Sequence, residues 1–211
     1  IGMEVIIKTF LDKRMMDFCT PIVFASSKVA SFHRKVLEIK NFSFNIIKSF
    51  KNINDKQANL INCWDEDVVL NIGESSEEVG KYAYLSLEKA KEALKNNEID
   101  VLVTAPINKS SIQKNKEDFI GHTEYLEQNF EGKSLMMMIS SNMKIAFVTS
   151  HVPLVEVPKL LTKTKISENL KMINETLIQD FGIRKPKIAV IGLNPHAGEE
   201  GMLGKEEEEI I

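Results

Sequence analysis

Short apolar runs alternate with longer segments of helical periodicity along most of the chain. Apolar residues that recur every three or four positions predict helices, which cover residues 5–15, 26–37, 75–94, 123–130 and 166–181, with another beginning at 206. Short continuous apolar runs predict strands, at residues 22–25, 44–47, 68–72, 99–104, 135–140, 144–150 and 187–191. Because strands alternate with helices, the pattern favours an α/β fold with a largely parallel sheet.

Local signals mark where several of these elements begin and end. Ser75 and Glu78 have the spacing of a capping box, in which each side chain bonds a backbone N–H at a helix start. Gly182 follows the last long helix as a typical helix terminator. Polar residues around 52–59 predict a loop, and Ser141-Asn142 predicts a turn between two strands.

Composition narrows the class of protein. With 211 residues, 43% of them hydrophobic and 27% charged, the chain is an ordinary globular sequence, which excludes collagen-like and wholly disordered proteins. A net charge of −3 leaves no basic excess for binding nucleic acid. The longest apolar runs, such as Ile188–Leu193, are too short to cross a membrane. Cys19 and Cys63 are isolated, so we expect buried thiols in a cytoplasmic protein.

Both ends of the sequence look cut. The chain opens at Ile1 directly into a helical pattern, without an initiator methionine. It stops at Ile211, just after a helix begins, and we interpret Glu206–Glu209 as the solvated face of that helix start. We therefore expect the 211 residues to be part of a longer protein.

Candidate chemistry lies in the loops that follow strands, where α/β folds bind their ligands. Three of the four histidines, His122, His151 and His196, lie in such loops. A structural role is the default for one such histidine, but His151 and His196 each follow a strand directly, next to a proline. Neutral imidazole is the commonest ligand of zinc. A catalytic metal needs about three protein ligands, so Asp, Glu or a histidine beyond Ile211 would have to complete the site.

His122 and Thr123 stand at the predicted start of a helix. Thr123 could simply cap the helix, or both side chains could bind an anion together with the helix N-terminus. Lys109 could be a surface charge, or could pair with a carboxylate or phosphate. The fingerprints of Rossmann folds, P-loops and hydrolase elbows are absent. The residues alone thus indicate a metal-assisted enzyme with a small anionic substrate.

At these loops the sequence resembles the 4-hydroxythreonine-4-phosphate dehydrogenases of vitamin B6 synthesis. The matching motifs occur in order along the chain and are IGMEV (1–5), VTAPINK (103–109), GHTEYLE (121–127), TSHVPL (149–154) and GLNPHAGEEGMLGKEE (192–207). The last motif is long and specific. Met3 stands where the family usually has proline, which should alter only the helix start.

The resemblance implies a three-layer α/β/α fold like that of isocitrate and isopropylmalate dehydrogenases. Two domains would hold the active site in the cleft between them. Roughly, residues 1–105 would belong to a first domain completed by residues outside this sequence, and residues 106–211 to an incomplete second domain. The family works as a homodimer, with the active site at the subunit interface.

The resemblance also implies a reaction. Family members use NAD (or NADP) to oxidise the 3-hydroxyl of 4-phosphooxy-L-threonine, and the product loses carbon dioxide to give 3-amino-2-oxopropyl phosphate, a precursor of pyridoxal phosphate. Three histidines hold a divalent metal, usually zinc, with magnesium or cobalt as alternatives. His151 and His196 match two of them, and the third is expected beyond Ile211. His122 and Thr123 match the substrate-binding pair, and Lys109 takes a catalytic, polar role in the active site.

Two alternatives stay open. Related enzymes oxidise D-threonate or D-erythronate 4-phosphate with the same metal histidines, and nothing in His122 or Thr123 separates these substrates. A non-catalytic binding protein could also keep the fold and lose hydride transfer. Most of the nicotinamide-binding part and the later substrate contacts are expected outside the 211 residues.

Overall fold

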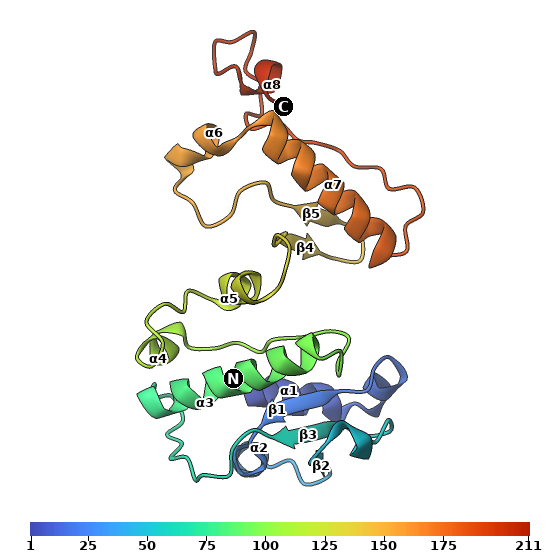
Figure 1. Ribbon diagram of the computed structural model, residues 1–211, viewed down its shortest axis with the longest axis vertical. Coiled ribbons are helices and arrows are strands. Elements are labelled where there is room, and N and C mark those ends of the chain that lie inside the picture. Colours follow the sequence, from blue (N-terminus) through green and yellow to red (C-terminus); the bar gives the residue numbers. More distant parts are fainter. The chain divides into compact units, whose positions relative to one another are not determined.

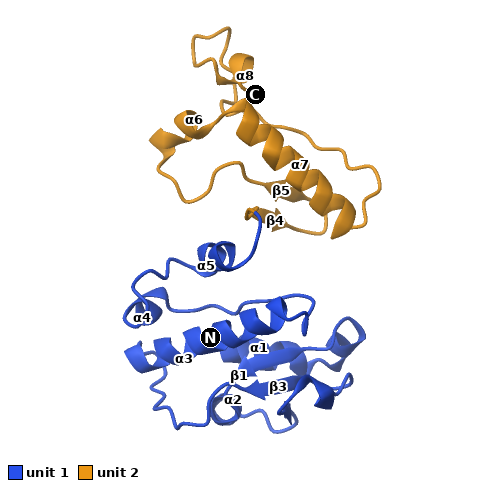
Figure 2. Cartoon of the chain, viewed as in Figure 1, with its two compact units in different colours: residues 1–132 blue, residues 133–211 orange.

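The computed structural model describes all of residues 1–211, which form helices, short strands and connecting loops (Figure 1). Contacts divide the chain into unit 1, residues 1–132, and unit 2, residues 133–211 (Figure 2). The expected domain boundary near residue 105 refers to a longer protein and stays a prediction.

Unit 1 contains a parallel sheet of three strands, with β3 (Asn59–Asn62) between β1 (Ile22–Ala25) and β2 (Asn45–Ile47). Leu60 lies opposite Val23 on one side and opposite Ile46 on the other. Leu60 is fully buried. The core around it also contains Val23, Ala25 and Ala30, and Met3, Ile6, Phe10 and Phe44 pack against it. The parallel sheet expected from the sequence is therefore confirmed in this unit.

Most helices of unit 1 occupy the predicted places, but the first begins and ends earlier than the predicted 5–15. They are α1 (Gly2–Leu11), α2 (Ser27–Val36), α3 (Glu77–Lys95), α4 (Lys109–Gln113) and α5 (His122–Asn129), with short 3₁₀ turns at Lys13–Asp17 and Phe50–Asn52. The predicted capping box is wrong by one residue. Ser76, not Ser75, caps α3, and its hydroxyl accepts a hydrogen bond from the Val79 N–H at 3.1 Å.

The third strand does not lie where the sequence pattern predicts it, because this strand begins with a buried polar residue. Residues 68–72 form no strand, and β3 begins instead at Asn59, where a polar loop is predicted. Asn59 is fully buried. Its amide NH₂ donates to the carbonyl oxygens of Asn54 and Gln57 at 2.9 and 3.0 Å, and its carbonyl accepts from the Asn45 amide at 2.8 Å. A fully bonded amide tolerates burial, so polarity misled the prediction.

Two further predicted strands, residues 99–104 and 187–191, are absent. Both segments are apolar, yet neither pairs with another strand in residues 1–211. The Val103 and Ile191 side chains are 88% and 86% exposed. A strand needs a hydrogen-bonding neighbour, and an apolar sequence alone does not supply one.

Unit 2 has a different sheet. β4 (Met137–Ile139) and β5 (Lys144–Ala146) pair antiparallel around the predicted turn, as strands joined by a short turn do. Helices follow at Val157–Leu160 (α6), Lys163–Gln179 (α7) and Glu206–Glu209 (α8), with a 3₁₀ turn at Leu154–Glu156. Gly182 ends the α7 region as predicted: at φ +65° it lets the Ile183 N–H bond the Leu177 carbonyl at 2.9 Å.

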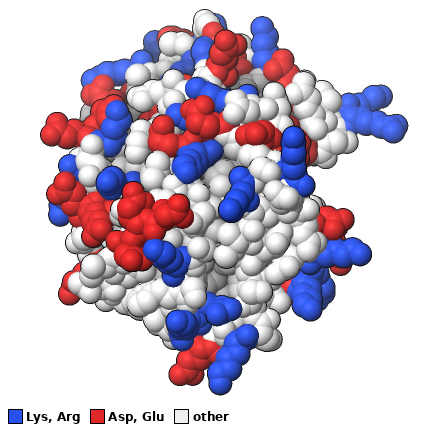
Figure 3. All heavy atoms as spheres, turned by 60° about the horizontal axis from the view of Figure 1, so that its bottom comes forward, with Lys and Arg blue, Asp and Glu red and all other residues white.

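Surface properties agree in part with the composition. Basic and acidic side chains interleave over the face shown in Figure 3. No helix is both long enough and apolar enough to cross a membrane. Both cysteines are free thiols, but Cys19 is exposed, so its predicted burial is wrong. Cys63 is buried as expected, and burial raises the pKa of its thiol to about 11.

Replacing Asn59 tests how far the sheet of unit 1 depends on this amide. Asn59→Ala should lower the free energy of unfolding by about 3 kcal/mol, because it leaves several buried backbone groups without partners. Urea denaturation of the full-length protein measures the change. Asn41→Ala, at an exposed position, should stay within about 0.5 kcal/mol of wild type. Equal effects of the two substitutions would contradict the role given to Asn59.

Candidate functional site

Lys109 is the first residue of α4, and its side chain reaches the start of α5. Asn108 caps α4 by accepting a hydrogen bond from the Ser111 N–H at 3.1 Å. A Cβ added to Gly121 would lie only 3.2 Å from Lys109 Nζ and 2.9 Å from Glu124 Oε2. The Lys109 ammonium and the Glu124 carboxylate therefore both lie against the backbone of Gly121.

α5 begins without a side-chain cap. Gly121 is the N-cap residue, and it offers the helix start no side-chain hydrogen bond. Thr123 lies inside the first turn and is exposed, so the interpretation of Thr123 as the cap is wrong. Uncapped N–H groups at a helix start bind anions readily, because the helix dipole adds to their hydrogen bonds.

His122 is half-buried beside this helix start. Its ring meets the Phe119 ring edge-on, with centroids 6.4 Å apart. Burial lowers the pKa of the imidazole, and the positive charge of Lys109 lowers it further. The imidazole is therefore neutral at pH 7, and can both donate and accept a hydrogen bond. Lys109, His122 and the start of α5 together provide what an anionic ligand needs.

The start of α1 lies against the loop that leads to Lys109. A Cβ on Gly2 would be 3.2 Å from the Pro106 carbonyl oxygen and 3.3 Å from the Ala105 Cβ. A larger residue at position 2 would push this loop away. The IGMEV segment therefore contacts the VTAPINK segment directly.

The two histidines of unit 2 are exposed, and left-handed backbone occurs at His151 and directly after His196. His151 follows β5 and has φ +55°. His196 follows Pro195, and its N–H bonds Asn194 Oδ1 at 2.8 Å. Left-handed backbone continues after it at Ala197, Gly198, Glu199, Glu200 and Gly201. Non-glycine residues in this conformation are uncommon and concentrate at functional sites.

Glu207 closes the loop that carries His196. Its Oε1 accepts a hydrogen bond from the Asn194 N–H at 2.6 Å, and the Asn194 amide donates to the Leu203 carbonyl at 3.3 Å. The Glu207 Oε2 is buried without a hydrogen-bond partner. The interpretation of Glu206–Glu209 as a solvated face is therefore wrong for Glu207, which turns toward the loop. The sequence shows only a run of four carboxylates at 206–209, which gives no sign of this contact.

The residues present supply part of a metal site. Two imidazoles are the ligand type that zinc prefers, but nowhere in residues 1–211 do three or more His, Cys, Asp or Glu side chains gather as a metal site would need. His151 and His196 thus fit a metal only as an incomplete set, and their role stays a prediction.

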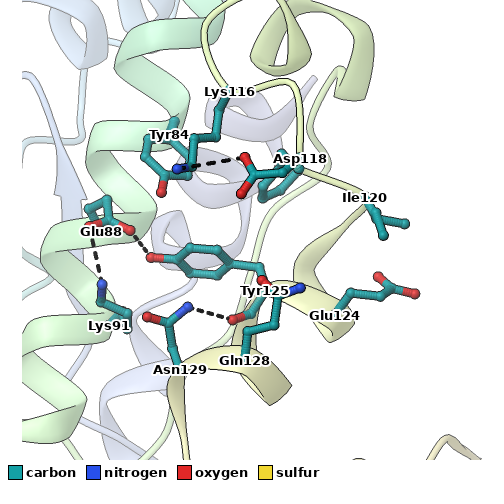
Figure 4. A pocket seen from close by; sticks show the side chains of 11 residues that line it. Tyr84, Glu88, Lys91, Lys116, Asp118, Ile120, Glu124, Tyr125, Gln128 and Asn129 are labelled. Carbon is teal, nitrogen blue, oxygen red and sulfur yellow. Dashed lines mark hydrogen bonds and ion pairs between the residues drawn. The ribbon is translucent and has the colours of Figure 1, made fainter.

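A further cluster escapes sequence reasoning. Glu88 and Lys91 of α3 meet Tyr125 of α5 beside a polar cavity of about 230 Å³ (Figure 4). The spacing of Glu88 and Lys91 is compatible with any solvated helix face. Only the burial of Lys91 reveals the cluster, and burial of a lysine is rare enough that the sequence does not suggest it.

Known proteins resemble this chain over its full length. A protein from Bacteroides thetaiotaomicron named 4-hydroxythreonine-4-phosphate dehydrogenase is 44% identical over 213 residues, covering 100% of this chain and 58% of the relative. One from Oceanobacillus iheyensis, provisionally named a D-threonate 4-phosphate dehydrogenase, is 33% identical and covers 99% of this chain and 64% of the relative. The crystal structure of a 4-hydroxythreonine-4-phosphate dehydrogenase from Burkholderia phymatum matches with a TM-score of 0.85 and 27% identity. The match covers 100% of this chain and 64% of the chain in that structure.

These relatives are all named as dehydrogenases, and the chain shares the mixed α/β fold of the solved structure. The family model of the pyridoxal phosphate biosynthetic protein PdxA matches residues 17–211. The chain belongs to this PdxA family, which confirms the resemblance seen in the sequence. It spans less than two thirds of the length of these relatives.

Removing the charge of Lys109 should raise the pKa of His122, because burial would then be the main remaining cause of its depression. NMR titration of the imidazole signals in a Lys109→Met variant measures this change. Lys114→Met, at an exposed residue that ends α4, is the matched control and should leave the titration unchanged. The same titration curve in both variants would contradict the proximity of Lys109 and His122.

The depressed pKa of His122 also has a consequence for stability. The imidazole of His122 binds a proton more readily in the unfolded chain than in the folded one. Its contribution to the free energy of unfolding is therefore complete above the unfolded pKa near 6.5. It is lost as the pH falls through the lower folded pKa. Between pH 7.5 and pH 5.5, the melting temperature of wild type should therefore fall more than that of His122→Gln. An identical fall in the melting temperature of both proteins would show that the pKa of His122 is not lowered by folding.

Proposed function

We propose that this chain is part of an enzyme that uses NAD to oxidise 4-phosphooxy-L-threonine, with decarboxylation to 3-amino-2-oxopropyl phosphate, in pyridoxal phosphate synthesis. The observation that carries the proposal is the anion-binding arrangement of Lys109 and His122 at the uncapped start of α5, in a chain 44% identical to a relative of that name. Two parts of the proposed active site lie in residues 1–211, namely the start of α5 and the two histidines His151 and His196, and each has a proposed role.

The start of α5 binds an anionic group of the substrate. Backbone N–H groups of the first turn and the ammonium of Lys109 neutralise its charge, and the Thr123 hydroxyl adds a hydrogen bond. The neutral imidazole of His122 donates to an oxygen without adding a second full positive charge. This combination favours a phosphate or carboxylate over a neutral ligand.

His151 and His196 hold a divalent metal, zinc by preference and magnesium or cobalt as alternatives, with a third ligand outside residues 1–211. A bound metal would supply a Lewis acid for the substrate hydroxyl, and NAD (or NADP) would supply the hydride acceptor. The contribution of this chain is to orient the imidazoles. The strained backbone at His151 and the Glu207 hydrogen bond to the His196 loop serve that purpose.

The complete protein would have a three-layer α/β/α fold like that of isocitrate dehydrogenase, with the active site in a cleft between two domains. We further propose a homodimer with the site at the subunit interface, acting in the cytoplasm on a small phosphorylated substrate. Neither nucleic acid nor a membrane would be a partner.

A second candidate is oxidation of D-threonate or D-erythronate 4-phosphate. It is supported by the 33% identity to the Oceanobacillus iheyensis relative over nearly the whole chain. His122, Thr123 and Lys109 would serve the same phosphate in either substrate, so these residues do not distinguish an amino from a hydroxyl group at the second carbon.

One assay separates the candidates. The full-length protein is given NAD with 4-phosphooxy-L-threonine or with D-threonate 4-phosphate, each with and without a chelator, and NADH is followed by absorbance. Chelator-sensitive turnover of the threonine compound alone would support the first proposal. Preference for the threonate would support the second, and no turnover of either with metal present would favour a non-catalytic binding protein.

Replacing either proposed metal ligand should abolish turnover without unfolding the protein. We expect His196→Ala and His151→Asn to lower kcat by about a hundredfold or more. The free energy of unfolding should change by only about 0.5 kcal/mol, because both side chains are exposed. Asn is chosen at position 151 because it tolerates the left-handed backbone there.

His33→Gln on α2 is the control and should keep normal turnover. Full activity in either ligand variant would refute the metal assignment. Metal content measured in the same samples should fall together with kcat.

A further inference from the structure

α5 is held to the rest of unit 1 chiefly by one side chain. Of its eight residues only Tyr125 is buried, at 7% exposure. Tyr125 packs with Leu87 of α3, Ile112 of α4 and Phe119. A short helix with a single buried residue depends on that residue for its position, and this helix carries His122 and Thr123 in its first turn.

Tyr125 is also bonded to α3 through its hydroxyl. The O–H donates to Glu88 Oε1, and Lys91 Nζ lies 3.1 Å from Glu88 Oε2 (Figure 4). Lys91 Nζ lies 3.1 Å from Glu92 Oε1 and 5.6 Å from the centre of the Tyr125 ring. The Lys91 side chain is only 7% exposed. Three polar groups thus satisfy one another at the contact between the two helices.

The protonation states of this network are fixed around neutral pH. Burial raises the pKa of the Tyr125 hydroxyl, and its hydrogen bond to Glu88 raises it further. Burial also acts to raise the pKa of Glu88, but hydrogen bonds from Tyr125, Lys91 and Tyr84 outweigh it and keep that pKa below its usual value. Tyr125 therefore stays a donor, and Glu88 stays an ionised acceptor.

The network lies one helical turn from the candidate site. His122 and Tyr125 are three residues apart on α5, a spacing that brings side chains to the same side of a helix. Both rings also contact Phe119, with centroids 6.4 and 5.9 Å from it. Movement of Tyr125 relative to α3 would therefore displace His122.

We propose that Tyr125, Glu88 and Lys91 are positioning residues that hold His122 and Thr123 in the arrangement that binds the anionic substrate. None of the three touches the substrate. The proposal rests on the function proposed above, because it assigns His122 and Thr123 to substrate binding.

Tyr125→Phe tests the proposal in the full-length enzyme. Loss of the hydroxyl should raise KM for 4-phosphooxy-L-threonine about fivefold, with kcat within about twofold of wild type. Damage to folding alone would lower kcat by reducing the active fraction, and would leave KM unchanged. Tyr82→Phe is the matched control: it removes a hydroxyl from the same helix, α3, at a ring that stacks on Trp64 with centroids 4.7 Å apart. It should leave KM within about twofold of wild type.

A spectroscopic measurement tests the same point without turnover. NMR titration of His122 should show a higher pKa in Tyr125→Phe than in wild type, because a loosened α5 exposes the imidazole, and no change in Tyr82→Phe. The charged groups around this helix start are Lys109 of α4 and Glu124 of α5, and both variants retain them. If wild type turns over neither phosphorylated substrate, the proposed function fails, and the titration alone decides the positioning role.

Replacement of the acceptor gives a second test. Glu88→Gln keeps an oxygen that can accept from Tyr125, whereas Glu88→Leu does not. The Gln variant should therefore recover most of the substrate affinity that the Leu variant loses. The proposal is overturned if Tyr125→Phe behaves like Tyr82→Phe in both KM and titration, or if the Gln and Leu variants share the same KM.

Discussion

Buried polar groups must find hydrogen-bond partners, and unit 1 is organised by two places where they do. Asn59 lies inside the parallel sheet and bonds the loop that precedes β3. Lys91 lies between α3 and α5 and is neutralised by Glu88. An unpartnered polar group at either place would cost more than most single apolar contacts contribute. The packing of the sheet and the placement of α5 therefore both depend on this constraint.

The helices were easier to predict from the sequence than the strands of the sheet. Periodicity located α2, α3, α5 and α7 because each has an apolar face in the sequence, and β1 and β2 because each is a short apolar run. β3 was missed because Asn59 makes a buried strand look polar. Residues 99–104 and 187–191 failed in the opposite way: they have the sequence of strands, but a strand also needs a neighbour.

The candidate site shows the same division between local and distant information. Lys109, His122 and Thr123 could be named from the sequence, because each stands in a loop or at a helix start. Their closeness in space could not be predicted, since it depends on the Lys109 side chain lying against the backbone of Gly121. The sequence does not reveal the roles of Glu207 and Glu88, because their partners Asn194 and Tyr125 lie 13 and 37 positions away. Charged residues such as these and Lys91 are equally typical of a solvated helix face.

The loop around His196 has one more property, which concerns how the chain folds. The hydrogen bonds that shape it join Asn194 to Leu203 and to Glu207, residues separated by only 9 and 13 positions. Short loops close on a timescale of tens of nanoseconds, far faster than contacts between distant segments form. This stretch can reach its conformation from its own sequence, before the remainder of the unit is assembled, and His196 then enters the later steps of folding with its backbone already set.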